Sequence, residues 1–179
     1  MALTATMYNL TVELADIDRG VYQSLEMRMA RQPSETSEYM LMRLLAYCLE
    51  YAEGIALTEG VASGDEPAVL IRDLTGRVTA WIEVGLPAAG RLHRGSKLAG
   101  RAAVYTHREI RQVRAALDGQ KIHNAEEIPV YAFERRFVEE VAAMIDRRTD
   151  LSISVTEREL YLGINGGTHA TTIAEHRFS

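Results

Sequence analysis

Alternating polar and apolar residues open the chain, and a helical repeat follows them. Residues 3–14 and 22–30 each alternate with a period of two, and the turn-rich segment 16–20 separates them. This period is typical of β-strands, so the two runs predict a long hairpin. Apolar residues at helical spacing then predict a helix that begins at the capping residue Ser34 and ends at Gly54.

The rest of the chain alternates short strands with helices. The pattern predicts strands at 68–71, 78–84, 102–106 and 129–133. It predicts helices at 88–98, 108–117 and 134–146. A C-terminal antiparallel meander follows, with strands at 150–155, 159–164 and 168–174. The central strand–helix–strand order indicates some parallel pairing. We therefore predict an α/β (α+β) fold with a mixed central sheet flanked by helices.

Length and composition limit the class of protein. The 179 residues fit one domain over 1–179, and an apolar fraction of 47% is ordinary for a globular core. No apolar run approaches the ~20 residues that cross a bilayer, and the start of the chain lacks the basic and apolar blocks of a signal peptide. A single cysteine cannot form an internal disulfide. These features predict a cytoplasmic protein with no membrane partner.

The charge is unevenly distributed along the chain. The net charge is −5, yet the stretch from Arg91 to Lys121 holds eight basic and two acidic residues, a net charge of +6. Such a local excess can attract phosphate even on an acidic protein, and it makes nucleic acid or another phosphate-bearing ligand a candidate partner. A solvated helix face gives the same composition, and composition alone favours that simpler interpretation.

Five acidic residues stand where strands and helices begin or end. They are Glu35 and Glu38 at the start of the long helix, Asp65 and Glu66 before a strand, and Glu83 near the end of an otherwise apolar strand. Carboxylates that converge at a sheet end would suit Mg²⁺ or Mn²⁺, and the metal could activate a bound water. The alternative is that Glu83 faces solvent on an edge strand and pairs with an arginine. On the long helix, periodicity favours Glu38 over Glu35, although a first-turn residue can still reach over a sheet end.

Five blocks of the sequence resemble the bacterial YaeQ family. They are residues 1–6, Arg-Gln-Pro-Ser-Glu-Thr at 31–36, Met-Arg-Leu-Leu-Ala at 42–46, Gly-Asp-Glu-Pro at 64–67 and Trp-Ile-Glu-Val-Gly-Leu-Pro at 81–87. The resemblance covers essentially the whole chain, and the second and fifth blocks are specific. It implies no established biochemical function. It does imply a fold similar to that of the PD-(D/E)xK nucleases, a variant of the restriction-endonuclease core.

The resemblance implies a set of catalytic acids. In that core a helix supplies a Glu, one strand an Asp, and the next strand an acid-x-Lys pair that completes the metal site. Asp65 or Glu66 matches the first acid, Glu83 matches the second, and Glu35 or Glu38 matches the helical Glu. The lysine position holds Gly85, which departs from the pattern of the core.

Basic residues of the following helix are candidates to replace that lysine, as in other branches of the nuclease fold. Lys97 suits charge stabilisation at a scissile phosphate, with Arg91 and Arg94 as the alternatives. Arg91, Arg94 and Arg101, which share one side of the predicted helix, and Ser34 are the expected phosphate-binding residues. A basic helix face that is exposed to solvent and has no function would show the same sequence pattern.

Other cofactor sites are not expected. The glycine-rich segment 163–167 follows a strand but does not open a helix, so it predicts a hairpin and no dinucleotide loop. The five histidines lack the spacing of a metal-binding helix, and only one cysteine is present. We expect no nucleotide cofactor, haem or zinc.

Three functions follow from these patterns. The first is a Mg²⁺-dependent nuclease or phosphodiesterase with Asp65 and Glu83 as metal ligands. The second is a non-catalytic module that binds nucleic acid or a nucleotide, which Gly85 favours. The third is a purely structural ion-pair network of Glu35, Arg31 and Glu83. The substrate and the oligomeric state are left open.

Overall fold

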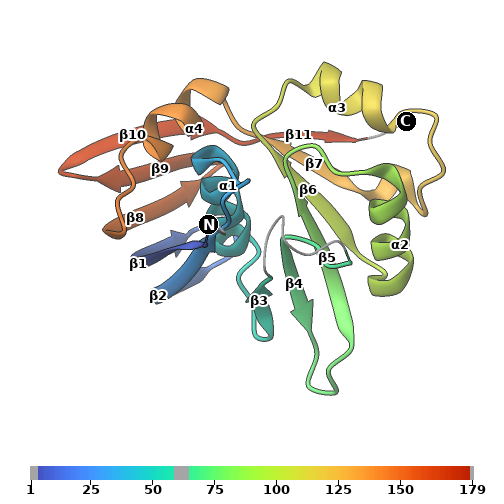
Figure 1. Cartoon of the computed structure of the whole chain (residues 1–179), viewed down its shortest axis with the longest axis horizontal. Helices are drawn as coiled ribbons and strands as arrows, with labels where there is room; N and C mark the ends of the chain where they lie inside the picture. Colours follow the sequence, from blue (N-terminus) through green and yellow to red (C-terminus); the bar gives the residue numbers. More distant parts are fainter. Residues whose placement is uncertain (1–3, 59–64, 178–179) are drawn as a thin grey trace.

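In this computed structural model, which describes residues 4–58 and 65–177, the chain forms two β-sheets and four α-helices (Figure 1). One sheet has the strand order β10-β9-β8-β1-β2, and the other has the order β11-β7-β6-β5-β4-β3. Both sheets mix parallel and antiparallel neighbours, so the mixed α+β class is confirmed. The predicted mixed sheet flanked by helices is the six-stranded one, and the opening hairpin lies in a second sheet because it pairs with the C-terminal strands.

The five-stranded sheet combines the opening hairpin with the C-terminal meander. The predicted hairpin is confirmed as β1 (Thr6–Asp16) and β2 (Val21–Arg31). The predicted meander is confirmed as β8 (Arg148–Thr156), β9 (Glu159–Ile164) and β10 (Gly167–Thr172). Because β1 pairs in parallel with β8, the hairpin and the meander form one sheet.

Three parallel strands form the centre of the six-stranded sheet. They are β5 (Val78–Val84), β6 (Ala102–Thr106) and β7 (Pro129–Ala132). Antiparallel strands flank them: β4 (Val69–Arg72) and then β3 (Ile55–Leu57) beside β5, and β11 (Ala174–Arg177) beside β7.

Two details of the strands differ from the prediction. Strand β3 was not predicted, because three half-buried residues are too few to show an alternation. The strand predicted at 168–174 is divided at Ile173. This buried residue carries the chain from β10 in one sheet to β11 in the other.

The four predicted helices are confirmed as α1 (Ser37–Leu49), α2 (Ala89–Ala99), α3 (Ile110–Leu117) and α4 (Arg135–Ala142). A short 3₁₀ helix, Ala125–Glu127, precedes β7. The predicted cap of α1 is wrong. The chain first turns at Gln32–Glu35, where the Glu35 N–H donates to the Gln32 carbonyl at 2.9 Å, and Thr36 is the N-cap, accepting a hydrogen bond from the Tyr39 N–H at 3.1 Å.

Helix α1 lies between the two sheets and explains the shape of the core. Residues 40–46 are all buried, as are Cys48 and Leu49, and both sheets and α4 pack around them in one cluster. A second cluster lies on the far face of the six-stranded sheet, under α2 and α3. The layers are therefore sheet, helices, sheet, helices (Figure 1). Among the described residues, no helix has the length and apolar character to cross a membrane.

Candidate functional site

A cleft of about 820 Å³ opens at the edge where the parallel strands β5 and β6 end. All four helices begin at this edge, after Thr36, Ala88, Glu109 and Glu134. Residues from the first turn of each helix, or from just before it, line the cleft. A helix N-terminus presents free N–H groups and the positive end of the macrodipole. The cleft therefore suits an anionic ligand, in the place where α/β sheets bind ligands.

Glu83 lies beneath this cleft and is fully paired. Its side chain is 0% exposed, and β5 is an interior strand, so the alternative of a solvent-facing edge position is wrong. The Arg91 guanidinium donates to both carboxylate oxygens, from Nε to Oε1 at 2.9 Å and from Nη2 to Oε2 at 2.6 Å. Trp81 Nε1 donates to Oε1 at 2.8 Å. Buried carboxylates need such partners, and Arg91 and Trp81 occupy both oxygens of this one.

Glu35 forms a second buried ion pair, in the wall of the cleft. Arg43 donates to it from Nε to Oε1 at 2.6 Å and from Nη2 to Oε2 at 3.1 Å, and both side chains are almost fully buried. The Gln32 N–H donates to Oε2 at 3.1 Å, and Arg31 donates to the Glu35 carbonyl at 3.0 Å. The expected ion-pair network thus exists in part. Glu35 and Glu83 each have their own arginine, and Arg31 contacts only the backbone of Glu35.

Tyr39 lines the cleft, close enough to both ion pairs to feel their charges. Burial raises the pKa of its hydroxyl, and the nearby Glu83 carboxylate raises it further, although Arg91 and Arg43 oppose this. The hydrogen bond to Glu83 raises the pKa of Arg91. At neutral pH the cleft therefore presents a neutral phenol beside a permanently charged guanidinium.

Gly85 lies two residues after Glu83, at the position where the family resemblance implied a lysine. Its φ is +79°, which is a left-handed conformation that residues with a Cβ adopt at a cost of about 1 kcal/mol. A Cβ at this position would lie 3.5 Å from the Tyr39 ring. The turn from β5 into α2 therefore favours glycine at position 85.

The remaining predicted acids lie in different surroundings. Glu38 is half-buried and lines the cleft, close to His107. Asp65 is exposed and Glu66 is half-buried, and neither lines the cleft. The structure therefore brings Glu35, Glu38 and Glu83 to the region of the cleft. Asp65 and Glu66, the two candidates for the first acid of the metal site, lie outside it.

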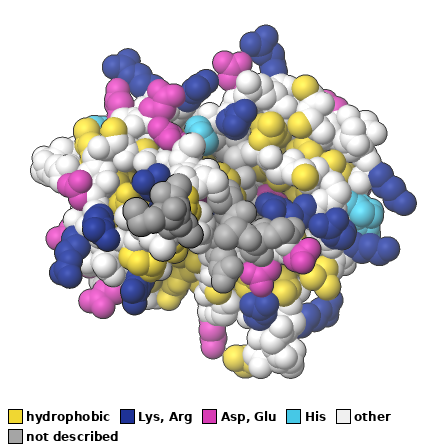
Figure 2. Space-filling model, in the orientation of Figure 1, with side chains coloured by type: hydrophobic (Ala, Val, Ile, Leu, Met, Phe, Trp, Pro, Cys, Tyr) yellow, Lys and Arg dark blue, Asp and Glu magenta, His cyan; other side chains and the backbone are white. Residues whose placement is uncertain are grey.

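The predicted basic residues are spread along α2. Arg91 lines the cleft, whereas Arg94 and Lys97 are exposed beyond it, where basic side chains gather over α2 (Figure 2). The Arg94 guanidinium lies near Gly90 and so extends toward the start of the helix. Arg101 follows the far end of α2 and pairs with Glu50 at 2.6 Å, roughly 15 Å from Arg91 along the helix axis. Arg101 therefore does not share a site with Arg91. Exposed Ser34 lines the cleft.

The cleft residues that were not selected from the sequence include His107, Arg108 and Arg135. Arg108 donates to Gln112 at 3.3 Å, and Arg135 pairs with Glu139 at 2.8 Å. Within the described residues, His107 Nδ1 is buried without a hydrogen-bond partner, and burial lowers the pKa of this imidazole. The signal that would have found them is their place directly after the parallel strands β6 and β7.

The predicted ligands of Mg²⁺ or Mn²⁺ do not form a donor set in this arrangement. Both oxygens of Glu83 are bound by Arg91, and Asp65 is exposed outside the cleft. In the part of the chain that the structure describes, no group of three or more His, Cys, Asp or Glu is arranged to hold a metal ion. Hard cations need free oxygen ligands, so these residues fit one only if Arg91 moves away. The metal site stays a prediction.

Fold and cleft together define a class, namely an α+β protein of two sheets with an arginine-lined cleft beyond its parallel strands. The family model described as "YaeQ protein" matches residues 1–173, so the chain belongs to the YaeQ family. It is 32% identical over 164 residues to "Uncharacterized protein YaeQ" of Escherichia coli (strain K12), covering 90% of each chain. It is 36% identical over 107 residues to the protein of the same name from Salmonella typhi, covering 60% of this chain and 59% of that one.

Solved structures show the same fold. The YaeQ protein from Pseudomonas syringae superposes with a TM-score of 0.87 at 30% identity, over 98% of this chain and 97% of that one. The YaeQ protein from Xanthomonas axonopodis pv. citri superposes with a TM-score of 0.85 at 25% identity, over 98% of this chain and 100% of that one. The names of these relatives state no activity.

Proposed function

We propose that this protein is a non-catalytic module that binds a nucleic-acid strand through its phosphates in the cleft. The observation that supports this proposal is that the two buried carboxylates at the cleft, Glu35 and Glu83, are each paired with an arginine. Glu83 is neutralised by Arg91 and Glu35 by Arg43, each through two hydrogen bonds. The acids that a nuclease would use for a metal instead hold guanidinium groups in place.

Three guanidinium groups line the cleft, from Arg91, Arg108 and Arg135. Each has five N–H donors, and the hydrogen bonds to Glu83, Gln112 and Glu139 use only one or two of them. Arginine binds phosphate oxygens through such a fork, and the four helix N-termini add positive potential at the same place. Tyr39, Leu86 and Pro87 supply apolar surface beside these charges, against which a base can pack.

Reversing two of these charges should weaken binding of a short, end-labelled single-stranded DNA, measured by fluorescence anisotropy at low salt. We expect the double variant Arg108→Glu/Arg135→Glu to lose at least about tenfold in affinity, because both contacts become repulsive. The matched control is Arg72→Glu/Arg77→Glu, which makes the same charge change at exposed positions of the β4–β5 hairpin. Equal loss in both double variants would show that the cleft is not the binding surface.

A second candidate is a metal-dependent phosphodiesterase, and the position of Glu83 favours it. Glu83 stands at the end of β5 beside the cleft, where the family resemblance puts the second catalytic acid. This function needs Arg91 to release Glu83 when metal and substrate arrive. Asp65 or Glu66 would then have to approach Glu83 to complete the site.

A metal titration separates the two functions. We expect no saturable Mg²⁺ or Mn²⁺ binding to the wild-type protein by calorimetry, because the Glu83 oxygens are occupied by Arg91 and Trp81. Binding that saturates in the wild type and disappears in Glu83→Gln would instead support the phosphodiesterase. Cleavage of the labelled DNA strand in the presence of the metal would complete that case.

A further inference from the structure

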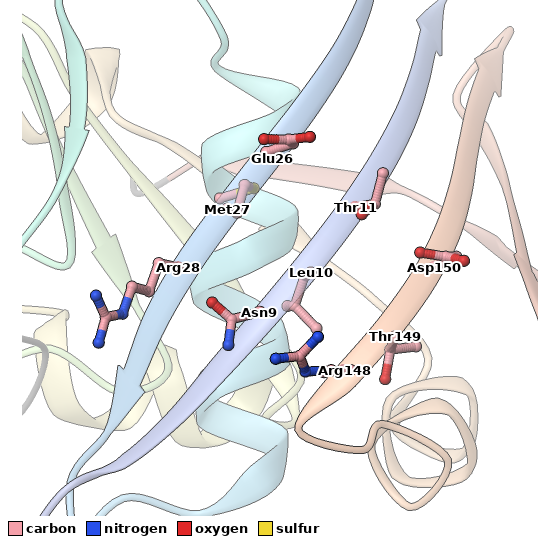
Figure 3. A pocket seen from close by; sticks show the side chains of 9 residues that line it. All are labelled: Asn9, Leu10, Thr11, Glu26, Met27, Arg28, Arg148, Thr149 and Asp150. Carbon is pink, nitrogen blue, oxygen red and sulfur yellow. The ribbon is translucent and has the colours of Figure 1, made fainter.

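The outer face of the five-stranded sheet carries two rows of opposite charge (Figure 3). We name them the cationic row, which is Arg28, Asn9 and Arg148, and the acidic row, which is Glu26, Thr11 and Asp150. The strand register sets both rows, because Asn9 and Thr11 of β1 each pair with one residue of β2 and one of β8. All six side chains are exposed, and they line a hollow of about 500 Å³.

Neither row is neutralised within its own chain. Among the ion pairs of the described residues, none includes a residue of either row. The opposite face of the same strands, which includes Leu10 and Met27, is buried against α1, and Figure 3 shows that helix behind the strands. The rows therefore face outward, with unpaired charge of both signs.

We propose that this face binds a second copy of the chain. Consider a two-fold axis that lies in the interface, runs across the strands and passes between the two rows. Rotation about this axis brings the cationic row of each copy over the acidic row of the other copy. The same surface of both copies then forms the contact, as an isologous interface requires. Arg28 then faces Glu26 of the second copy and Arg148 faces Asp150, while Asn9 faces Thr11. Symmetry repeats each contact, which gives four opposite-charge pairs.

The neighbouring positions agree with this symmetry. The next position beyond the cationic row holds Met7 and Ala30, and the next beyond the acidic row holds Glu13 and Ser24. The same axis places Glu13 over Met7 and Ser24 over Ala30, so no like charges meet. A polyanion such as nucleic acid would instead be repelled by Glu26 and Asp150. The charge pattern therefore fits a second copy better than it fits nucleic acid.

The size of the face predicts a weak and reversible dimer. The axis superimposes β1, β2 and the start of β8 on their counterparts and leaves β9 and β10 outside the contact, so the facing area is on the order of 300–400 Å² per copy. This is about half of the roughly 800 Å² per partner of a standard interface, and the contacts are polar. Attraction between exposed charges is screened by salt, so association should be strongest at low ionic strength.

Charge-reversed variants test the pairing directly. One variant is Arg28→Glu/Arg148→Glu, which makes both rows acidic, and the other is Glu26→Arg/Asp150→Arg, which makes both rows basic. Sedimentation equilibrium of the wild type should show a reversible dimer that weakens as salt is raised. Each variant alone should associate at least about tenfold more weakly than the wild type. An equimolar mixture should recover association, because acidic rows then face basic rows.

The recovery in the mixture cannot come from a merely structural effect of the substitutions. Circular dichroism melts of each variant check that it is folded. The control variant Arg72→Glu/Arg77→Glu changes residues at the β4–β5 hairpin of the six-stranded sheet, outside the proposed interface, and should dimerise like the wild type. A wild type that stays monomeric at every concentration and salt would overturn the proposal. A mixture that associates no better than its components would also overturn it. The cleft takes no part in this interface, so nucleic-acid binding can fail or succeed independently.

Discussion

Replacing Arg43 by alanine is expected to lower the free energy of unfolding by about 3–5 kcal/mol. Arg43 lies within α1, between the two sheets, and its side chain is 1% exposed. The substitution leaves the Glu35 carboxylate, itself almost fully buried, without its cation. It also removes the hydrogen bond from Arg43 to the Ala30 carbonyl at 2.7 Å, which ties α1 to β2. Urea denaturation followed by circular dichroism measures the change.

Two further variants separate the cost of an unpaired buried charge from the loss of an arginine. The double variant Glu35→Leu/Arg43→Met removes both charges and should recover most of the lost stability, because no uncompensated charge remains. Arg136→Ala breaks an exposed pair with Glu140, which water and salt screen, and should lower the stability far less than Arg43→Ala does. If Arg43→Ala cost no more than Arg136→Ala, the buried pair would not hold α1 as described. The wall of the cleft at Ser34–Thr36 would then need another anchor.

Local elements were predictable from the sequence because they depend on residue spacing. The opening hairpin and the meander show the period of two, and each appears in the structure. The partner of each strand was not predictable, because the parallel pairing of β1 with β8 joins residues far apart in the chain. One signal was available in α1. Met42 and Ala46, which lie outside its main apolar stripe, are also apolar, and a helix that is apolar on most sides lies between layers.

The candidate site was predicted in part for the same reason. Alternation along β5 puts Trp81 and Glu83 on one face, and Trp81 Nε1 does donate to Glu83. The pair Glu35–Arg43 was hidden, because Glu35 lies in the turn at Gln32–Glu35 before α1 and not within the helix, so helical spacing does not relate the two residues. Arg101 was expected beside Arg91, and the length of α2 separates them.

Substituting Gly95 by alanine is expected to destabilise the protein by about 1–3 kcal/mol, which is unusual for this exchange within a helix. Gly95 lies on the face of α2 that packs on β5, and a Cβ there would overlap the Trp81 ring. The indole is 5% exposed within the second core, so it has little room to move. Chemical denaturation gives the change in the free energy of unfolding.

Gly90 on the same helix provides the matched control. A Cβ at Gly90 would meet only the end of the Arg94 side chain, at 3.9 Å, so Gly90→Ala should be neutral or stabilise the protein by up to about 1 kcal/mol. Opposite signs for the two substitutions would establish that close packing on Trp81, and not helix propensity, decides the result at Gly95. Because Trp81 also donates to Glu83, a displaced indole would loosen the Glu83–Arg91 pair beneath the cleft. Under the proposed function, Gly95→Ala should therefore also weaken binding of the DNA strand, whereas Gly90→Ala should leave it unchanged. If Gly95→Ala were as stable as Gly90→Ala, α2 would not pack on β5 as closely as described.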